Sequence, residues 1–167
     1  MVPGTLWFLV VGSVLAAEPP PITPAQGTDG VWRTEIVIPA SVEAIRAALG
    51  DPIQAARFSP DITKIQYVTR ETCPTLHVET GGSFMPVNYD YRRCATKSGW
   101  HETLLSSNML STYEVRWTFE SVEAGTKVSY DVHIKPTFPA PDFLFARAMR
   151  ESITTLVGRL YRNVTGG

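Results

Sequence analysis

The sequence predicts an α+β fold in which a curved antiparallel sheet of about seven strands wraps a long C-terminal helix. First, apolar residues between Ile62 and Ile134 alternate in short segments separated by Gly- or Ser-containing turns, which is typical of an antiparallel meander. Second, residues 143–162 carry apolar side chains at helical spacing. Third, the 167 residues are 44% hydrophobic and 19% charged, so the chain can bury the core of one domain.

The N-terminal residues differ in composition from the rest of the chain. Residues 5–17 read TLWFLVVGSVLAA, an uncharged stretch that is shorter than the roughly 20 residues of a membrane-spanning helix. It suits the apolar region of a signal peptide, and small residues permit cleavage near Ala16 or Ala17. We therefore predict a signal peptide at 1–17 and a periplasmic or secreted protein. The residues before Thr5 include no Lys or Arg, so an uncleaved anchor or a buried N-terminal strand remains an alternative.

The next segment, residues 18–30, reads EPPPITPAQGTDG and has no apolar periodicity. Such proline-rich stretches favour extended chain, and we predict a disordered spacer here. The folded domain is then expected at residues 31–165.

Two short helices are predicted directly after the first strand. This strand covers Val31–Ile38 and ends at Pro39. Ser41 is a good N-cap for a helix that ends at Gly50, and the Asp51-Pro52 pair starts a second helix through Ala56. The remaining strands of the meander are expected at Ile62–Val68, Thr75–Thr80, Val87–Thr96, Trp100–Leu105, Thr112–Phe119 and Thr126–Ile134.

The last hairpin of the meander has a register that the sequence specifies. A two-residue turn at Ala124-Gly125 places apolar residues opposite apolar residues on one face and polar opposite polar on the other. A slip of one residue would mix the two faces. The predicted apolar pairs are Phe119 with Tyr130, Trp117 with Val132, and Val115 with Ile134.

An earlier hairpin brings the two cysteines together. With its turn centred on Gly82-Ser83-Phe84, the apolar residues of the two strands pair as Leu76 with Tyr91 and Val78 with Tyr89. The same register places Cys73 opposite Cys94, within the range of a disulfide. Together with the export signal this favours a Cys73–Cys94 disulfide over two unrelated thiols.

The C-terminal helix is predicted at Phe143–Arg162 with Asp142 as its N-cap, after a proline-rich lead-in. Its apolar stripe has to be buried, and the inner face of the sheet is the large apolar surface available to it. The stripe consists of Phe143, Ala146, Met149, Ile153, Leu156, Val157 and Leu160, with Arg150 as an alternative to Met149.

This order of elements resembles the START-like, or SRPBCC, superfamily with its helix-grip fold, which includes polyketide cyclases and coenzyme Q-binding START domains. The resemblance spans the whole domain and is carried by IVIPASVEAIRAAL near the start, by the hairpin YEVRWTFESVEAGTKVSYDV and by the helix FLFARAMRESITTLVGRLYR. It implies a cavity between sheet and helix that holds an apolar or amphipathic ligand. The superfamily has no invariant catalytic set, so the resemblance assigns no catalytic residue.

Aromatic residues on the inner face of the sheet are the strongest candidates for a ligand site. Several tyrosines share this face, and each hydroxyl needs a polar partner, as in a small-molecule pocket with a few polar groups. A simple packed core is the alternative. The candidate ligand-binding residues are Leu76, Val78, Tyr89, Tyr91, Tyr113, Trp117, Tyr130, Phe143, Met149 and Ile153.

The candidates for chemistry are few. The hairpin registers place His77 and His133 on the solvated faces of the sheet. Either His101 or Glu102 faces inward, depending on the length of the preceding turn, and the inward residue is a weak candidate for an acid or base. For Arg93, exposure at the sheet rim is favoured over a role in holding an anionic or carbonyl group.

Several functional classes are not supported by the sequence. No nucleotide-binding, nucleophile-elbow or metal motif is present, so we expect no cofactor and no metal. The net charge is −1 without a dense basic run, which argues against nucleic acid as a partner. The leading hypothesis is an exported, monomeric binding protein for a hydrophobic small molecule, with at most transient membrane contact. The alternatives are a cyclase or dehydratase using Glu102 or His101 with tyrosines, and a protein-interaction module.

Overall fold

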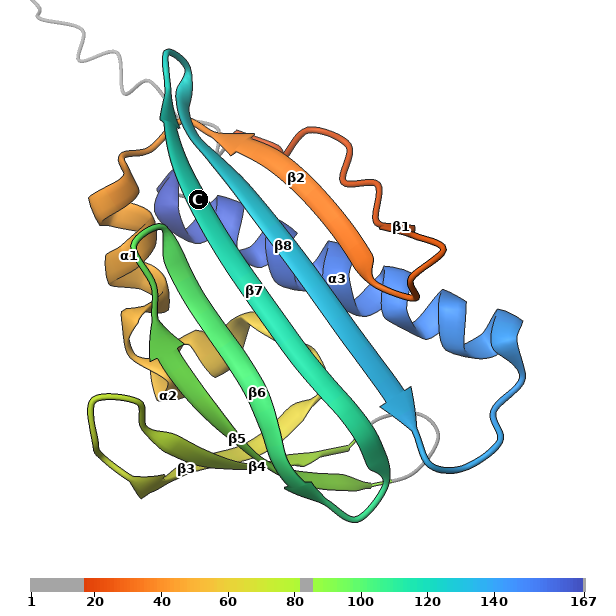
Figure 1. Cartoon of the computed structure of the whole chain (residues 1–167). Coiled ribbons are helices and arrows are strands. Elements are labelled where there is room, and N and C mark those ends of the chain that lie inside the picture. Colours follow the sequence, from red (N-terminus) through yellow and green to blue (C-terminus); the bar gives the residue numbers. More distant parts are fainter. Residues whose placement is uncertain (1–16, 82–85, 167) are drawn as a thin grey trace, which may run out of the picture.

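A computed structural model of the chain describes residues 17–81 and 86–166. Within these residues an eight-stranded antiparallel sheet has the strand order β1-β2-β8-β7-β6-β5-β4-β3 (Figure 1). The strands are β1 (Ala25–Gln26), β2 (Trp32–Ile38), β3 (Ile62–Thr69), β4 (Thr75–Thr80), β5 (Val87–Ala95), β6 (Gly99–Ser107), β7 (Leu110–Val122) and β8 (Gly125–Pro136). The helices are α1 (Val42–Gly50), α2 (Pro52–Ala55), the 3₁₀ turn η1 (Ala56–Phe58) and α3 (Asp142–Val164).

The sheet covers one side of α3, and the two short helices lie at one end of it (Figure 1). The direction of the strands turns progressively across the sheet from β2 to β3. In the view of Figure 1, β3, β4 and β5 therefore lie in the lower part of the molecule. This is the predicted α+β helix-grip architecture, with the short strand β1 in addition to the seven expected strands.

The helix starts follow from local chemistry, with one correction. The Ser41 side chain accepts a hydrogen bond from Ala44 N, and the Asp51 side chain accepts one from Ile53 N, so the predicted cap at Ser41 and the predicted helix start at Asp51-Pro52 are confirmed. Asp142, in contrast, is the first residue of α3 and not its N-cap, which is Pro141 without a side-chain hydrogen bond. Its carboxylate still lies in the first turn, where the helix dipole favours negative charge.

The β4–β5 hairpin has the predicted register, with Leu76 opposite Tyr91 and Val78 opposite Tyr89. The turn residues 82–85 lie outside the described part of the chain. A disulfide joins Cys73 and Cys94, whose Cα atoms are 4.5 Å apart. The disulfide predicted from apolar pairing is therefore present in the structure.

The β7–β8 register differs from the prediction by two residues. Phe119 pairs with Val128, Trp117 with Tyr130 and Val115 with Val132. The reason is Gly125, which has a φ of +133° and pairs with Val122 instead of sitting in the turn. A Cβ on Gly125 would overlap the carbonyl oxygen of Ile38, so the glycine is needed for close packing against the end of β2. A shift of two residues leaves every side chain on its predicted face.

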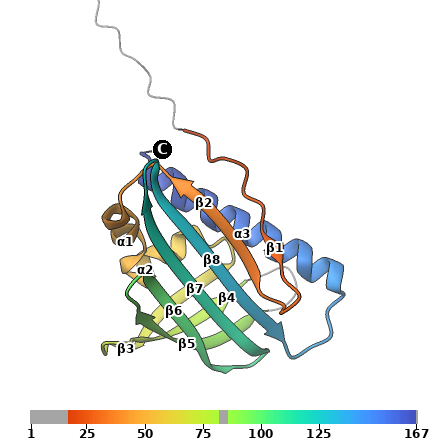
Figure 2. The same cartoon turned by 45° about the horizontal axis from the view of Figure 1, so that its top comes forward.

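The segment before β2 has a defined position, unlike the disordered spacer expected for residues 18–30. Ala25 and Gln26 pair with Arg33 and Trp32 of β2. Upstream, the Ile22 side chain packs beside Gly158 of α3, where a Cβ would lie 3.6 Å from Ile22 Cδ1. Figure 2 shows this segment running alongside α3 before it enters the sheet. The predicted signal peptide falls almost entirely on residues 1–16, outside the described residues.

The buried apolar residues form two clusters. The larger one joins α3 to β2, β7 and β8, and α3 contributes Met149, Ile153, Val157 and Leu160 to it. The smaller one consists of Leu76, Val78, Tyr89 and Tyr91 on β4 and β5. In the described part of the chain, no helix has the length and apolar character to cross a membrane.

Candidate functional site

Two adjoining cavities lie between the sheet and the helices. The inner cavity has a volume of about 190 Å³ and reaches toward α1 and β6. The outer cavity has about 390 Å³ and lies between β8, the segment after it and α3. Four residues line both cavities, namely Asp61, Thr80, Ile134 and Ser152. Small-molecule sites usually have volumes from about 300 to 1,000 Å³, and the outer cavity alone reaches that range.

The walls of the inner cavity are aromatic, as the sequence predicted. Tyr89, Tyr91, Tyr113, Trp117 and Tyr130 all line it, because alternate residues of β5, β7 and β8 point to the same face. The Tyr89 and Tyr113 ring centroids lie 4.8 Å apart, and those of Trp117 and Tyr130 lie 4.4 Å apart. Burial raises the pKa of each of these four tyrosines, so their hydroxyls stay protonated and can donate hydrogen bonds.

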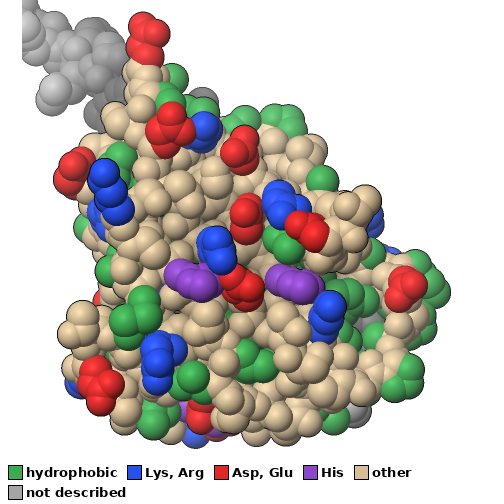
Figure 3. Space-filling model, viewed as in Figure 1, with side chains coloured by type: hydrophobic (Ala, Val, Ile, Leu, Met, Phe, Trp, Pro, Cys, Tyr) green, Lys and Arg blue, Asp and Glu red, His purple; other side chains and the backbone are tan. Residues whose placement is uncertain are grey.

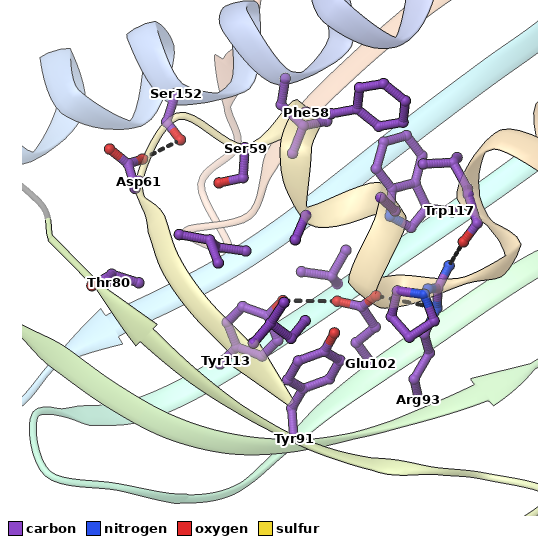
Figure 4. Close-up of a pocket in the computed structure, with 18 of the residues that line it drawn as sticks. Phe58, Ser59, Asp61, Thr80, Tyr91, Arg93, Glu102, Tyr113, Trp117 and Ser152 are labelled. Carbon is purple, nitrogen blue, oxygen red and sulfur yellow. Dashed lines mark hydrogen bonds and ion pairs between the residues drawn. The ribbon is translucent and has the colours of Figure 1, made fainter. Parts of the chain in front are cut away.

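Glu102, on β6, faces into the inner cavity, which resolves the alternative between Glu102 and His101. The Glu102 side chain is 7% exposed, and its Oε2 accepts a hydrogen bond of 2.7 Å from the Tyr113 hydroxyl (Figure 4). Its orientation follows from the register, since Glu102 pairs with Val115 in a row whose side chains all face inward. The sequence could not give this register because the turn before β6 had two possible lengths.

Arg93 is the second charged residue of the inner cavity, and its expected exposure at the sheet rim is wrong. Its side chain is only 5% exposed, with Nε 3.5 Å from Glu102 Oε1. Nη2 donates a hydrogen bond of 2.6 Å to the carbonyl oxygen of Leu49, near the C-terminal end of α1. The guanidinium also lies 4.6 Å from the centroid of the Trp100 ring. The helix end and the aromatic ring together stabilise a cation that β5 directs inward.

Hydrogen bonding inside the cavity is incomplete. Arg93 Nε is buried and has no hydrogen-bond partner among the described residues, because its geometry toward Glu102 satisfies an ion pair but not a hydrogen bond. A buried unsatisfied donor costs about 1–3 kcal/mol, so an oxygen atom of a ligand placed here would be stabilised.

Burial raises the pKa of Glu102 above its usual value, and the neighbouring Arg93 and the Tyr113 hydrogen bond partly oppose that effect. The cavity therefore holds a carboxyl group that keeps its proton to higher pH than an exposed glutamate, next to a permanent cation and a ring of phenol donors. This arrangement can hold a carbonyl, hydroxyl or anionic group, and it can also supply a proton.

The three histidines lie on the outer face of the sheet. His101 Nε2 is 2.9 Å from Glu114 Oε1, and His77 Nδ1 is 2.6 Å from Asp90 Oδ1. His133 packs beneath Gly30, beside the turn that leads into β2. Histidine, acidic and basic side chains are interspersed on the face shown in Figure 3. The outer-face placement predicted for His77 and His133 agrees with this, but His133 Nε2 is buried and has no hydrogen-bond partner among the described residues. His101 is removed from the candidate acids and bases of the cavity.

The other predicted ligand-binding residues have different positions. Met149 lines the outer cavity. Leu76, Val78 and Ile153 are buried in the two core clusters and line neither cavity of the described structure. Phe143 was expected on the helix opposite the tyrosines, but its side chain is 73% exposed, because α3 begins beyond the edge of the sheet that it crosses.

Sequence reasoning missed the polar residues at the junction of the two cavities. The Ser152 hydroxyl donates a hydrogen bond of 2.7 Å to Asp61 Oδ2 (Figure 4). Ser152 could have been found, since it lies three residues after Met149 and one before Ile153, on the apolar stripe of α3. Asp61, in a turn before β3, gave no such signal. No cluster of three or more metal-ligand side chains occurs in the described residues.

Comparisons with known proteins identify relatives of this architecture. The protein TTHA0849 from Thermus thermophilus superposes with a TM-score of 0.70 at 17% identity, covering 81% of this chain and 96% of its own. A START superfamily protein from Mycobacterium smegmatis gives 0.69 at 14% identity, with 81% and 97% covered. Human StAR-related lipid transfer protein 5 gives 0.67 at 10% identity, with 87% and 81% covered.

No curated protein sequence matches the chain significantly. A family model described as "Polyketide cyclase / dehydrase and lipid transport" matches residues 31–165, the boundaries predicted for the folded domain. The solved structures share the helix-grip fold, and the family model covers most of the sequence. The chain therefore belongs to the polyketide cyclase/dehydrase and lipid transport family, and it shares the fold of the START superfamily protein.

Proposed function

We propose that this protein is exported and binds an amphipathic small molecule, such as a lipid, a quinone or a polyketide-like ring compound. The observation that carries the proposal is the pairing of two adjoining cavities with different linings. The inner one ends at Arg93, Glu102 and Tyr113, and the outer one is largely apolar.

The volumes support one orientation of the ligand. The inner cavity, of about 190 Å³, accommodates a compact oxygen-bearing group, whereas the outer cavity, of about 390 Å³, accommodates an apolar body. An oxygen atom near Arg93 Nε would satisfy a donor that is otherwise buried without a partner. The family description includes lipid transport, and one structural neighbour is a lipid transfer protein, which supports the binding of an apolar compound.

A matched pair of fluorescent probes tests the proposal. Phenylnaphthylamine and anilinonaphthalene sulfonate share their aromatic body, but only the second carries an anionic group. Both are expected to bind with a stoichiometry of one and to be displaced by lipids extracted from the purified protein. Arg93→Met should weaken the sulfonate at least about tenfold and the neutral probe much less, because charge-assisted hydrogen bonds are lost only with the anion.

Arg116→Met is the matched control, since Arg116 is an exposed arginine on the outer face of the same sheet. It should leave both affinities unchanged. If neither probe binds the wild-type protein and solvent extraction yields no apolar compound, the proposed binding function is wrong.

Export is supported by the apolar segment at residues 5–17 and by the Cys73–Cys94 disulfide, which is the kind of bond that persists in oxidising compartments. Expression of the full chain, followed by N-terminal sequencing of the protein outside the cytoplasm, tests this part. Cleavage near Ala16 or Ala17 is expected, and an intact N-terminus on a cytoplasmic product would contradict it.

A cyclase or dehydratase activity is the second candidate, and the Glu102–Tyr113 hydrogen bond favours it. A protonated Glu102 would donate its proton to the hydroxyl of a β-hydroxy ketone, the C–O bond would break to release water, and the carboxylate so formed would take the proton from the adjacent carbon. Glu102→Gln should abolish such turnover of a model β-hydroxy ketone while leaving probe binding intact. A protein-interaction module would be supported by a filled core and a large exposed apolar patch, and the two cavities argue against it.

A further inference from the structure

One hydrogen bond lies at the junction between the two cavities and joins the long helix to the segment just before β3. Ser152 Oγ on α3 donates to Asp61 Oδ2 on the segment between η1 and β3, at 2.7 Å. The two residues are 91 positions apart in the sequence and line both cavities. Figure 4 shows the pair on the side of the cavity opposite Arg93 and Glu102.

Each partner is fixed to a different part of the fold. The Asp61 carbonyl oxygen accepts a hydrogen bond of 3.0 Å from Gly81 N, so Asp61 is attached to the sheet at the end of β4. Ser152 is attached to the core through its neighbour Ile153, which is 3% exposed. The hydrogen bond therefore spans the passage between the sheet edge and α3.

The Asp61 side of this contact is held less firmly than the Ser152 side. Asp61 immediately precedes β3, which is the edge strand of the sheet, and the β3–β4 ladder is irregular between Ile62 and Lys64. An edge strand with a bulge next to a loop is less firmly held than a helix whose apolar stripe is buried. The other polar contacts between this region and α3 are weak, namely Arg159 to Arg57 O at 3.3 Å and Arg57 to Asn163 at 3.4 Å.

We infer that the Asp61–Ser152 hydrogen bond is a latch that separates the outer cavity from the inner one and opens when a ligand enters or leaves. This inference rests on the proposed binding function, because it concerns access to the same site. A partly buried hydrogen bond of this kind contributes little net stability, so ligand entry can break it without unfolding the domain. Ligand affinity depends mainly on the cavity walls, whereas the rates of entry and exit depend on the latch.

Stopped-flow mixing with phenylnaphthylamine tests the latch. Ser152→Ala should raise the association and dissociation rate constants together, about two- to tenfold, and change the dissociation constant by less than about twofold. Ser152→Thr keeps a hydroxyl and should restore rates near those of the wild type. Thr154→Ala is the matched control, since Thr154 lies two residues from Ser152 on α3 but is exposed and lines neither cavity, and its rates should not change.

Asp61→Ala should have the same effect as Ser152→Ala, and the double variant should be no faster than either single one, because all three remove the same bond. Unchanged rates in Ser152→Ala would overturn the latch. So would a changed dissociation constant with an unchanged association rate, since that pattern belongs to a residue that contacts the bound ligand.

Hydrogen exchange of the ligand-free protein tests the latch independently of binding. The amide of Gly81 and those of the first residues of β3 should exchange faster in Ser152→Ala, while the amides of β7 and β8 stay as protected as in the wild type. Equal exchange at Gly81 would contradict the latch. If neither probe binds, the proposed function fails, and hydrogen exchange alone decides whether this bond holds the junction closed.

Discussion

The Tyr113 hydroxyl donates a hydrogen bond of 2.7 Å to Glu102 Oε2 inside the cavity, across the β6–β7 pair. This contact joins two groups of the inner cavity that can donate or accept a proton, a carboxyl group and a phenol. Burial raises the pKa of both groups. Both effects have one cause, which is that a charged oxygen loses its hydration when it is buried.

Stability should depend on pH through Glu102. Because the folded protein raises the pKa of Glu102 above 4.5, it binds more protons than the unfolded chain between pH 4.5 and the folded pKa. In that window the contribution of Glu102 to stability falls as pH rises. Urea unfolding from about pH 5 to about pH 8 should show that wild type loses stability relative to Glu102→Gln as pH increases.

Asp29→Asn is the control for this measurement. The hydrogen bonds from the Arg33 side chain and from Val31 N lower the pKa of Asp29 below its usual value, so its contribution is complete over this range and is lost only at lower pH, as pH falls through the folded pKa. The difference between wild type and Asp29→Asn should be flat over the same range. A flat profile for Glu102→Gln as well would show that Glu102 is not buried as described.

Tyr113→Phe should destabilise the protein by about 1–3 kcal/mol, because it removes a hydrogen bond from a buried carboxyl group. It should also raise the pKa of Glu102 further, since the lost bond favours the ionised form. Tyr91→Phe removes a hydroxyl from the same cavity wall and is expected to cost less. Urea unfolding of both variants, and of Tyr113→Phe in a Glu102→Gln background, would measure the coupling; additive losses would argue against the contact.

Replacing both cysteines with serine should destabilise the domain by about 3 kcal/mol without changing its fold. The estimate follows from the loop that the bond closes, which spans a sequence separation of 21 residues. The unfolded chain gains entropy when this constraint is removed. Urea unfolding of the double variant against the oxidised protein measures the loss, and mass mapping of the intact protein checks the pairing. Free thiols at Cys73 and Cys94 in protein purified without reductant would contradict the disulfide.

Ile22→Ala should lower stability by about 1 kcal/mol, because Ile22 is half-buried beside Gly158 and the substitution removes part of that contact. Thr23→Ala, at the exposed neighbouring position, is the control and should change stability very little. Thermal unfolding compares the two. Equal midpoints for both variants would mean that the segment before β2 adds nothing to the domain.

Local patterns were sufficient for much of the fold. The caps at Ser41 and Asp51 depend only on neighbouring residues, and the β4–β5 pairing depends on alternation that a one-residue slip would destroy. The same rule explains the limits of the β7–β8 prediction. Alternation distinguishes the two faces of a strand but not registers that differ by two residues, so contact with Ile38 at Gly125 had to decide between them.

The same difference between local pattern and tertiary contact separates the candidate site residues that were predicted correctly from those that were not. The tyrosines on β5, β7 and β8 were predicted because their facing follows from period-two alternation. Arg93 and Phe143 were misplaced because their burial depends on what other elements cover. The C-terminal end of α1 and the Trp100 ring enclose the Arg93 guanidinium, whereas nothing among the described residues encloses Phe143.

The sequence by itself determined the order of the elements, the faces of β4, β5, β7 and β8, the aromatic lining and the disulfide, because each follows from local spacing or from pairing between neighbouring strands. Only the tertiary structure decided that Glu102 and Arg93 meet inside the cavity, that Asp61 and Ser152 form a hydrogen bond at its junction, and that Ile22 lies on α3. These contacts join residues from different elements, and their distances depend on how the sheet curves around the helix, which no local pattern encodes.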